Sequence, residues 1–250
     1  MPPLGLHMAI ARQVQDALKA DDLCDEQGGY LLGSTAPDIR VLTRWDRQLT
    51  HFFDIFNFDD QHGVEGLFDA HPQVAKASLL NAESRAFMAG YLTHLEADEA
   101  WINLVYRPYF GVGSDLEGDN RANVLDRVLQ YELERRVRED QGFMESCATA
   151  LSKAALDIEV GFLERETLER WREVNLDVVA RPPDWDRFRH IASRHLRDAG
   201  IETMEAIDAF MTTIPDLLTE THTHVTQQKV DEFMDLARER SLASVREYLQ

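Results

Sequence analysis

His94 and Asp98 lie one helical turn apart in a segment whose apolar residues recur at helical spacing. That apolar stripe consists of Phe87, Tyr91, Trp101, Ile102 and Val105. Positions 94 and 98 complete the stripe, so the helical period places an imidazole and a carboxylate on the face that should be buried. A buried, ionised carboxylate is strongly unfavourable without a cation or a protonated partner. The pair therefore predicts either a divalent metal site or an imidazole–carboxylate hydrogen bond.

Three other residues combine the chemistry of a metal ligand with an apolar setting. His7 lies on the apolar face of the first expected helix, and His51 is set among large apolar residues in the run LTHFF. Asp38 follows a proline in STAPDI, where an acid also suits the first turn of a helix. Each of the three also fits a purely structural role. Asp54, three residues after His51, is a candidate to orient that imidazole through a hydrogen bond.

Taken in chain order, these pieces resemble the zinc-dependent phospholipase C family, whose relatives include the fungal single-strand nucleases. The pattern is a histidine in an N-terminal helix, then PDI, then THFFD, then GYLTHL with an aspartate three residues further on. The likeness covers about residues 4–107. Its most specific piece is GYLTHLEADEAW, which begins at Gly90.

The resemblance implies an all-helical fold and zinc ions that cleave phosphate esters. It assigns Asp38, His51, His94 and Asp98 to one metal site. It assigns His7 to a second site, with Asp98 as a carboxylate that bridges the two. Imidazole and carboxylate groups are suitable zinc ligands, and paired metals activate water and stabilise the charge of an in-line displacement.

The chain departs from the family at the remaining zinc ligands. Leu104 occupies the position of a histidine that follows the equivalent of Asp98 by six residues. No histidine after residue 94 has an Asp or Glu four residues later, so the family's His–x3–Glu pair is also missing. We therefore expect one or two ions, zinc or another divalent metal, and not three.

The surrounding sequence predicts an all-α protein, a multi-helix bundle of the zinc-dependent phospholipase C type with additional C-terminal helices. A long helix is expected over about 81–106, ending near Pro108 because a proline ring clashes with a continuing helix. Residues 50–80 predict short helices and loops, and the glycine-rich stretch 111–120 predicts a linker or lid. Further helices are expected at about 121–139, 143–157, 164–178, 184–199, 202–217 and 223–247. A metal-site region, 1–110, and a C-terminal helical region, 111–250, should pack as one domain.

Charge and composition narrow the expected partners. The 250 residues carry a formal net charge of −19, and 44% of them are hydrophobic, enough for a buried core. A surface with this much negative charge repels both nucleic-acid phosphate and anionic lipid. We therefore expect neither a nucleic-acid partner nor stable membrane association. Cys24 and Cys147 lie far apart, and no signal peptide or membrane-spanning run is visible. A cytoplasmic protein is predicted, with no indication of its oligomeric state.

The predicted function is zinc-dependent hydrolysis of a small-molecule phosphoester by a metal-activated water, with Asp38 as candidate proton acceptor. One alternative is a phosphohydrolase of the helical His/Asp type, which usually carries an adjacent His-Asp pair. No His-Asp dipeptide occurs in this chain. The other alternative is a non-catalytic scaffold or partner-binding protein that retains a structural metal or none, and the missing ligands favour it.

Overall fold

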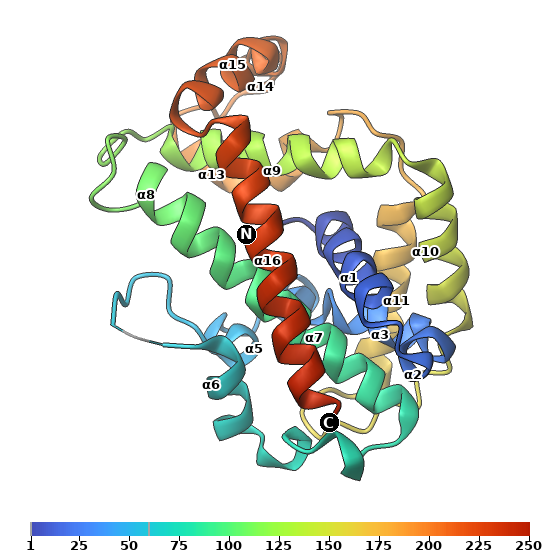
Figure 1. Ribbon diagram of the computed structural model, residues 1–250. Coiled ribbons are helices and arrows are strands. Elements are labelled where there is room, and N and C mark those ends of the chain that lie inside the picture. The colour runs from blue at the N-terminus through green and yellow to red at the C-terminus, as the bar shows by residue number, and fades with distance from the viewer. Residues whose placement is uncertain (1, 60) are drawn as a thin grey trace.

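The computed structural model describes residues 2–59 and 61–250, and these ranges fold into helices and connecting loops without a strand (Figure 1). The all-α fold predicted from the sequence is confirmed. The first half of the chain forms α1 (Leu4–Leu18), α2 (Asp21–Asp25), α3 (Gln27–Gly33), η1 (Ala36–Ile39), α4 (Arg40–Thr43), α5 (Gln48–His51), α6 (Gly63–Ala70), η2 (Pro72–Val74), η3 (Ala77–Leu79) and α7 (Ala82–Trp101). Within the described residues, no helix is both long enough and apolar enough to cross a bilayer.

The long helix α7 is the central element of the fold. Its N-cap is Asn81, whose side chain accepts a hydrogen bond from the Ser84 N–H at 2.7 Å. The helix runs on through a π-helical segment, η4 (Ile102–Tyr106), into the short α8 (Arg107–Tyr109). Nearly every side chain of α7 is buried, because α3, α16 and α1 pack around it. The expected long helix is thus confirmed.

A close approach between α3 and α7 depends on Gly90. A Cβ atom at Gly90 would collide with the backbone carbonyl oxygen of Tyr30, and one at Gly33 would collide with that of Phe87. The absence of a Cβ atom at these two glycines therefore lets α3 lie directly against α7. This contact matters for the site, because α3 leads into η1 and so brings Asp38 to α7.

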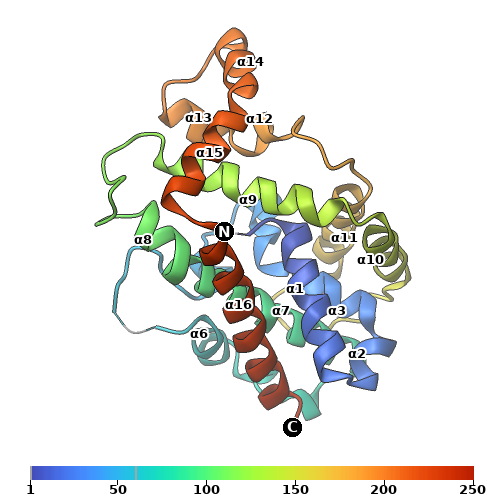
Figure 2. The ribbon, with the colours of Figure 1, turned by 45° about the horizontal axis from the view of Figure 1, so that its top comes forward.

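The second half of the chain forms α9 (Ala122–Arg138), α10 (Gln141–Lys153), α11 (Arg165–Val179), α12 (Phe188–Ile191), α13 (Ser193–Asp198), α14 (Met204–Thr212), α15 (Ile214–His224) and α16 (Gln227–Tyr248). Residues 111–120 join α8 to α9 without a regular helix. The last helix, α16, crosses the molecule alongside α7 (Figures 1 and 2). An aromatic contact joins the two, since the rings of Trp101 and Phe233 meet edge to face at 4.9 Å between centroids.

The helix expected at 143–157 ends at Lys153, and two other expected C-terminal helices are each interrupted. The helix expected at 184–199 is split into α12 and α13, which meet at Ala192. The helix expected at 202–217 breaks at Thr213, and the chain after it continues as α15. Pro215 explains the second break. A proline lacks an N–H and is tolerated in the first turn of a helix, where it lies in α15, but not in a helix interior.

Candidate metal centre

The five predicted metal ligands converge on one point of the fold. His7 comes from α1, Asp38 from η1, His51 from the end of α5, and His94 and Asp98 from α7. The imidazoles of His7 and His94 are fully buried, and His51 and Asp98 are exposed by only 1% and 2%. The side chain of Asp38 is 17% exposed, so it forms the outer edge of the cluster.

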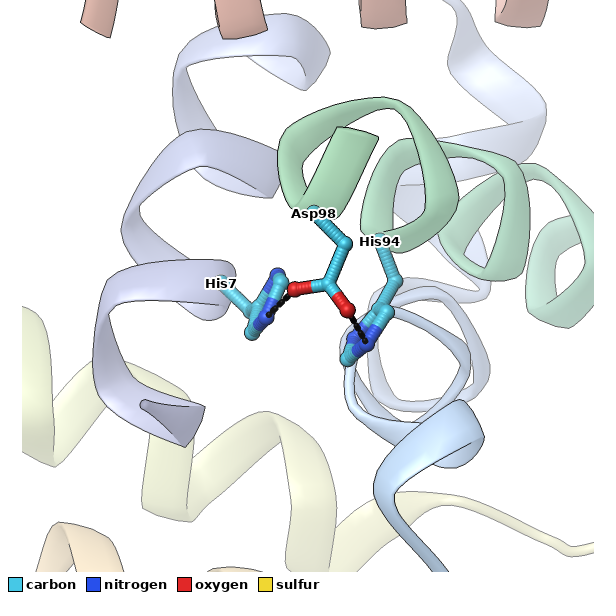
Figure 3. Close-up of side chains that lie close together, drawn as sticks. All are labelled: His7, His94 and Asp98. Atoms are coloured by element: carbon cyan, nitrogen blue, oxygen red, sulfur yellow. Dashed lines mark ion pairs between the residues drawn. The ribbon is translucent and has the colours of Figure 1, made fainter. Parts of the chain in front are cut away.

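The carboxylate of Asp98 lies at the centre. Its Oδ1 is 3.5 Å from Nε2 of His7, and its Oδ2 is 3.2 Å from Nε2 of His51 and 3.7 Å from Nε2 of His94. Figure 3 shows this carboxylate reaching down from α7 between two imidazoles. The rings of His7 and His94 stack at 3.7 Å between centroids. On the outer side, Oδ1 of Asp38 is 3.6 Å from Nε2 of His51.

Two sets of three ligand atoms are each compact enough to hold a metal ion. One set is His7, His94 and Asp98, and the other is Asp38, His51 and His94. Within each set, the ligand atoms all lie within 4.8 Å of one another. His94 belongs to both sets, so it is the residue on which either arrangement depends.

Hydrogen bonds on the far side of two rings fix which nitrogen faces the cluster. The Nδ1–H of His94 donates to the carbonyl of Ser34 at 2.9 Å, which leaves a lone pair on Nε2. Nδ1 of His51 lies 2.9 Å from the hydroxyl of Thr50, which also contacts the carbonyl of Arg47 at 3.3 Å. The lone pair of His94 Nε2 faces the carboxylate of Asp98 at 3.7 Å, and this contact is repulsive unless a cation or a proton lies between them.

Several polar atoms of the cluster are buried without a hydrogen-bond partner among the residues that the structure describes. They are Nδ1 and Nε2 of His7, Nε2 of His51, Nε2 of His94 and Oδ1 of Asp98. An unsatisfied buried polar group costs about 1–3 kcal/mol, so a native structure rarely gathers so many in one place. The donor set, three imidazoles and two carboxylates, is one that zinc prefers. The residues present therefore fit a zinc ion.

The protonation states also suit metal ligands. Burial, together with the neighbouring His7, lowers the pKa of His94 to about 3, so this imidazole is neutral near pH 7. Burial acts to raise the pKa of Asp98, but the nearby imidazoles of His94, His51 and His7 outweigh it and hold that pKa well below its usual range. The pKa of Asp38 is likewise held low, because His51 and His94 overcome the effect of burial. A neutral imidazole and ionised carboxylates are the forms that bind metal.

Arg47 was not among the predicted site residues, yet it contacts the cluster. Its Nη2 donates to Oδ2 of Asp98 at 2.9 Å, and its Nη1 donates to the carbonyl of Phe53 at 2.7 Å. Burial lowers the pKa of Arg47, and Asp98 and Asp38 act in the opposite direction. The guanidinium therefore supplies a positive charge to one oxygen of Asp98 and leaves the other oxygen facing His7.

The prediction for Asp54 is wrong. Its carboxylate accepts hydrogen bonds from the Phe56 N–H at 2.9 Å and from Gln48 at 3.4 Å. Nδ1 of His51 contacts Thr50 instead, and its Nε2 has no hydrogen bond, so Asp54 does not orient this ring. The residue next to His51 in the sequence takes that role.

Two further histidines near this part of the sequence lie away from the cluster. Nδ1 of His62 is 3.3 Å from Glu99, and the ring of His71 stacks on Phe162 at 4.3 Å between centroids. Neither joins a set of potential metal ligands among the described residues.

Comparisons of the chain with protein-family models, with curated proteins and with solved structures give no match.

Proposed function

We propose that this chain binds one divalent metal ion, zinc by its ligand types, and hydrolyses phosphoesters. The observation that carries the metal is the group of buried, unpaired ring nitrogens of His7, His51 and His94 around the carboxylate of Asp98. The resemblance of four sequence pieces to the zinc-dependent phospholipase C family supports phosphoester chemistry.

The shared position of His94 argues for one ion at a time. Nδ1 of His94 is engaged with Ser34, so only Nε2 can bind a metal, and a neutral imidazole nitrogen has a single lone pair. Both compact ligand sets require that atom. A second ion would retain two residues of its own set, and it would gain a third ligand only if the carboxylate of Asp98 bridged the two ions.

Asp38 is the residue of the cluster best placed for acid–base work. It is more exposed than the other four, and it lines a cavity that the others do not reach. A bound zinc ion supplies a Lewis acid that lowers the pKa of water and stabilises negative charge at phosphorus. The carboxylate of Asp38 is ionised and faces the space in which a substrate and a water molecule fit, so we assign it the role of proton acceptor.

One observation favours a second candidate, a non-catalytic protein. Arg47 already neutralises part of the charge of Asp98, and the cluster is almost completely buried. In that case the histidines, Asp98 and Arg47 form a structural network, with a structural metal or none. Metal content and hydrolysis, measured on the same preparations, separate the two candidates.

The experiment compares wild type with Asp98→Asn, Asp38→Asn and Asp54→Asn after dialysis against chelator and reloading with zinc. Zinc per chain is counted by elemental analysis, and hydrolysis is followed with p-nitrophenyl phosphate and bis(p-nitrophenyl) phosphate. Wild type and the control Asp54→Asn should bind about one zinc and turn over at least one ester. Asp98→Asn should lose both properties. Asp38→Asn should lower kcat by about 100-fold or more, the usual loss for a general base.

Zinc binding without hydrolysis in the wild type would support the structural candidate. Protein that takes up no transition metal under these conditions would show that the ligand assignment is wrong.

A further inference from the structure

Five arginines line a cavity beside the metal centre. This cavity has a volume of about 350 Å³ and lies between the start of α1, the turn from η1 to α4, α9, α11 and the segment that includes α12 and α13. The views in Figures 1 and 2 place α1, α9 and α11 next to one another. Asp38 belongs both to the cavity wall and to the metal cluster.

The charge of the cavity wall is opposite to that of the whole protein. Five arginines line it against two carboxylates, although the chain carries a net charge of −19. The arginines are Arg40, Arg127, Arg138, Arg181 and Arg187. The two carboxylates are largely committed elsewhere. Asp38 faces His51, and Glu134 accepts a hydrogen bond from the Leu6 N–H at 3.0 Å, at the first turn of α1. Arg181 and Arg187 share the carboxylate of Asp177, which does not line the cavity, so a smaller excess of positive charge faces it.

Three of these guanidinium groups hold a buried N–H without an acceptor. The Nε atoms of Arg40, Arg138 and Arg187 have no hydrogen-bond partner among the described residues. Arg138 also donates to the carbonyl of Pro182 at 3.2 Å, and its Nε is 3.6 Å from Glu134. Among the described residues, the ion-pair partner of Arg187 is the exposed Asp177, at 3.5 Å. Such an exposed pair contributes little, so Arg187 remains able to bind an anion, whereas the pair of Arg138 with Glu134 is buried.

The three groups approach the cavity from separate elements. Arg40 begins α4, Arg138 ends α9, and Arg187 directly precedes α12. Donors that converge from several directions suit a tetrahedral phosphate, which offers three or four acceptor oxygens, better than a planar carboxylate with two. The rest of the wall includes Tyr131 and His195 and a set of apolar side chains, Val41, Trp171, Val174, Val178 and Ile191. An organic group of comparable polarity fits against that surface.

We infer that this cavity is the binding site of an organophosphate anion, a phosphate ester whose organic group is apolar or aromatic. This inference rests on the proposed function in one respect, since it takes the ligand to be the substrate of the adjacent metal centre. The phosphate lies against the arginines next to Asp38, and the organic group packs against the side chains of α4, α11 and α12. The site depends on α9, α11 and α12, which lie outside the stretch of residues 4–107 that resembles the phospholipase C family.

The first test measures binding in the absence of metal. Chelator-dialysed protein is titrated calorimetrically with phenyl phosphate, with inorganic phosphate and with phenol. The variants are Arg40→Gln, Arg187→Gln and Arg187→Lys, and the matched control is Arg194→Gln, an arginine of α13 that is 83% exposed and does not line the cavity. Thermal melts establish that each variant folds as wild type does.

Phenyl phosphate should bind wild type and Arg194→Gln equally, and more tightly than either inorganic phosphate or phenol. Arg40→Gln and Arg187→Gln should each raise its Kd by about tenfold, the loss expected for one charge-assisted hydrogen bond. Arg187→Lys should recover part of that affinity, because it restores the charge but not the guanidinium geometry. An unchanged Kd in both glutamine variants, or no binding by wild type, would overturn the inference.

The second test uses zinc-loaded protein and separates this inference from the proposed function. If the zinc-loaded wild type hydrolyses p-nitrophenyl phosphate, Arg187→Gln should have a KM about tenfold higher than wild type. An unchanged KM would overturn the cavity assignment and leave the hydrolase proposal intact. If no ester is hydrolysed but the glutamine variants still lose affinity for phenyl phosphate, the cavity stands as an anion-binding site and the hydrolase proposal fails.

Discussion

Zinc should raise the melting temperature of the chelator-treated protein, and the substitution His94→Ala should remove that response. His94 contributes to both compact ligand sets, so its loss leaves neither intact. Within the described part of the chain, five buried polar atoms of His7, His51, His94 and Asp98 have no hydrogen-bond partner. A ligand that pairs with them stabilises the folded state alone.

The size of the response follows from mass action. A free zinc concentration of 100 times Kd stabilises the folded protein by about 2.7 kcal/mol. For a chain of this length, each kcal/mol shifts the melting temperature by about 2–4 °C. We therefore expect a rise of about 5–10 °C in the wild type and almost none in His94→Ala.

The assay is differential scanning fluorimetry over a series of buffered zinc concentrations, with magnesium as the comparison metal. His190→Ala serves as the matched control, because His190 is exposed and belongs to neither ligand set, and it should respond as wild type does. A wild-type melting temperature that stays constant across the zinc series would refute the metal site. An equal rise in His94→Ala would refute the assignment of this ligand.

Three further outcomes are expected. Metal-free protein should lose stability as the pH falls from about 6.5 toward 3, because burial lowers the pKa of His94 to about 3, so that in this range only the unfolded chain protonates this imidazole. The free energy of unfolding should fall by at most about 1.4 kcal/mol per pH unit. Thermal melts should show a weaker pH dependence in His94→Gln. Gly90→Ala should destabilise the fold by about 1–3 kcal/mol in urea titrations, because the new Cβ collides with the backbone of α3, whereas Gly142→Ala, which meets no atom closer than 3.5 Å, should not. Arg47→Met should lower the free energy of unfolding of the metal-free protein by about 3–5 kcal/mol, because it leaves the buried carboxylate of Asp98 without its cationic partner. The loss should be clearly smaller in the zinc-loaded protein, and an equal loss in both states would contradict this prediction.

The parts of the fold that follow from local pattern could be predicted from the sequence. The period of the apolar residues around His94 and Asp98 predicted both the long helix and the burial of these two side chains, which are exposed by 0% and 2%. Each of these predictions follows from residues of a single helix.

The contacts that depend on distant parts of the chain were missed. Arg47 lies 51 residues from Asp98, and no periodic pattern marks it as a buried side chain. Asp54 was chosen because it is close to His51 in the sequence, but the chain leaves α5 through Phe52 in a left-handed conformation, with φ of 54°. The carboxylate of Asp54 then caps its own loop. The arginines of the cavity come from α4, α9 and the segment between α11 and α12, so only the tertiary fold gathers them.

The place of Arg47 reconciles a stable metal-free fold with a metal site. A buried carboxylate without a cation would strongly destabilise the protein, and Arg47 removes that cost by donating to Oδ2 of Asp98. The same contact leaves Oδ1 unpaired and 3.5 Å from Nε2 of His7. One oxygen is thus held by the protein, and the other keeps the lone pairs that a metal requires. Arg47 therefore need not leave Asp98 when zinc binds to His7, His94 and Oδ1, and it would orient the carboxylate as a hydrogen-bond partner behind the ligand. Only a metal that takes both oxygens of Asp98 would have to displace it.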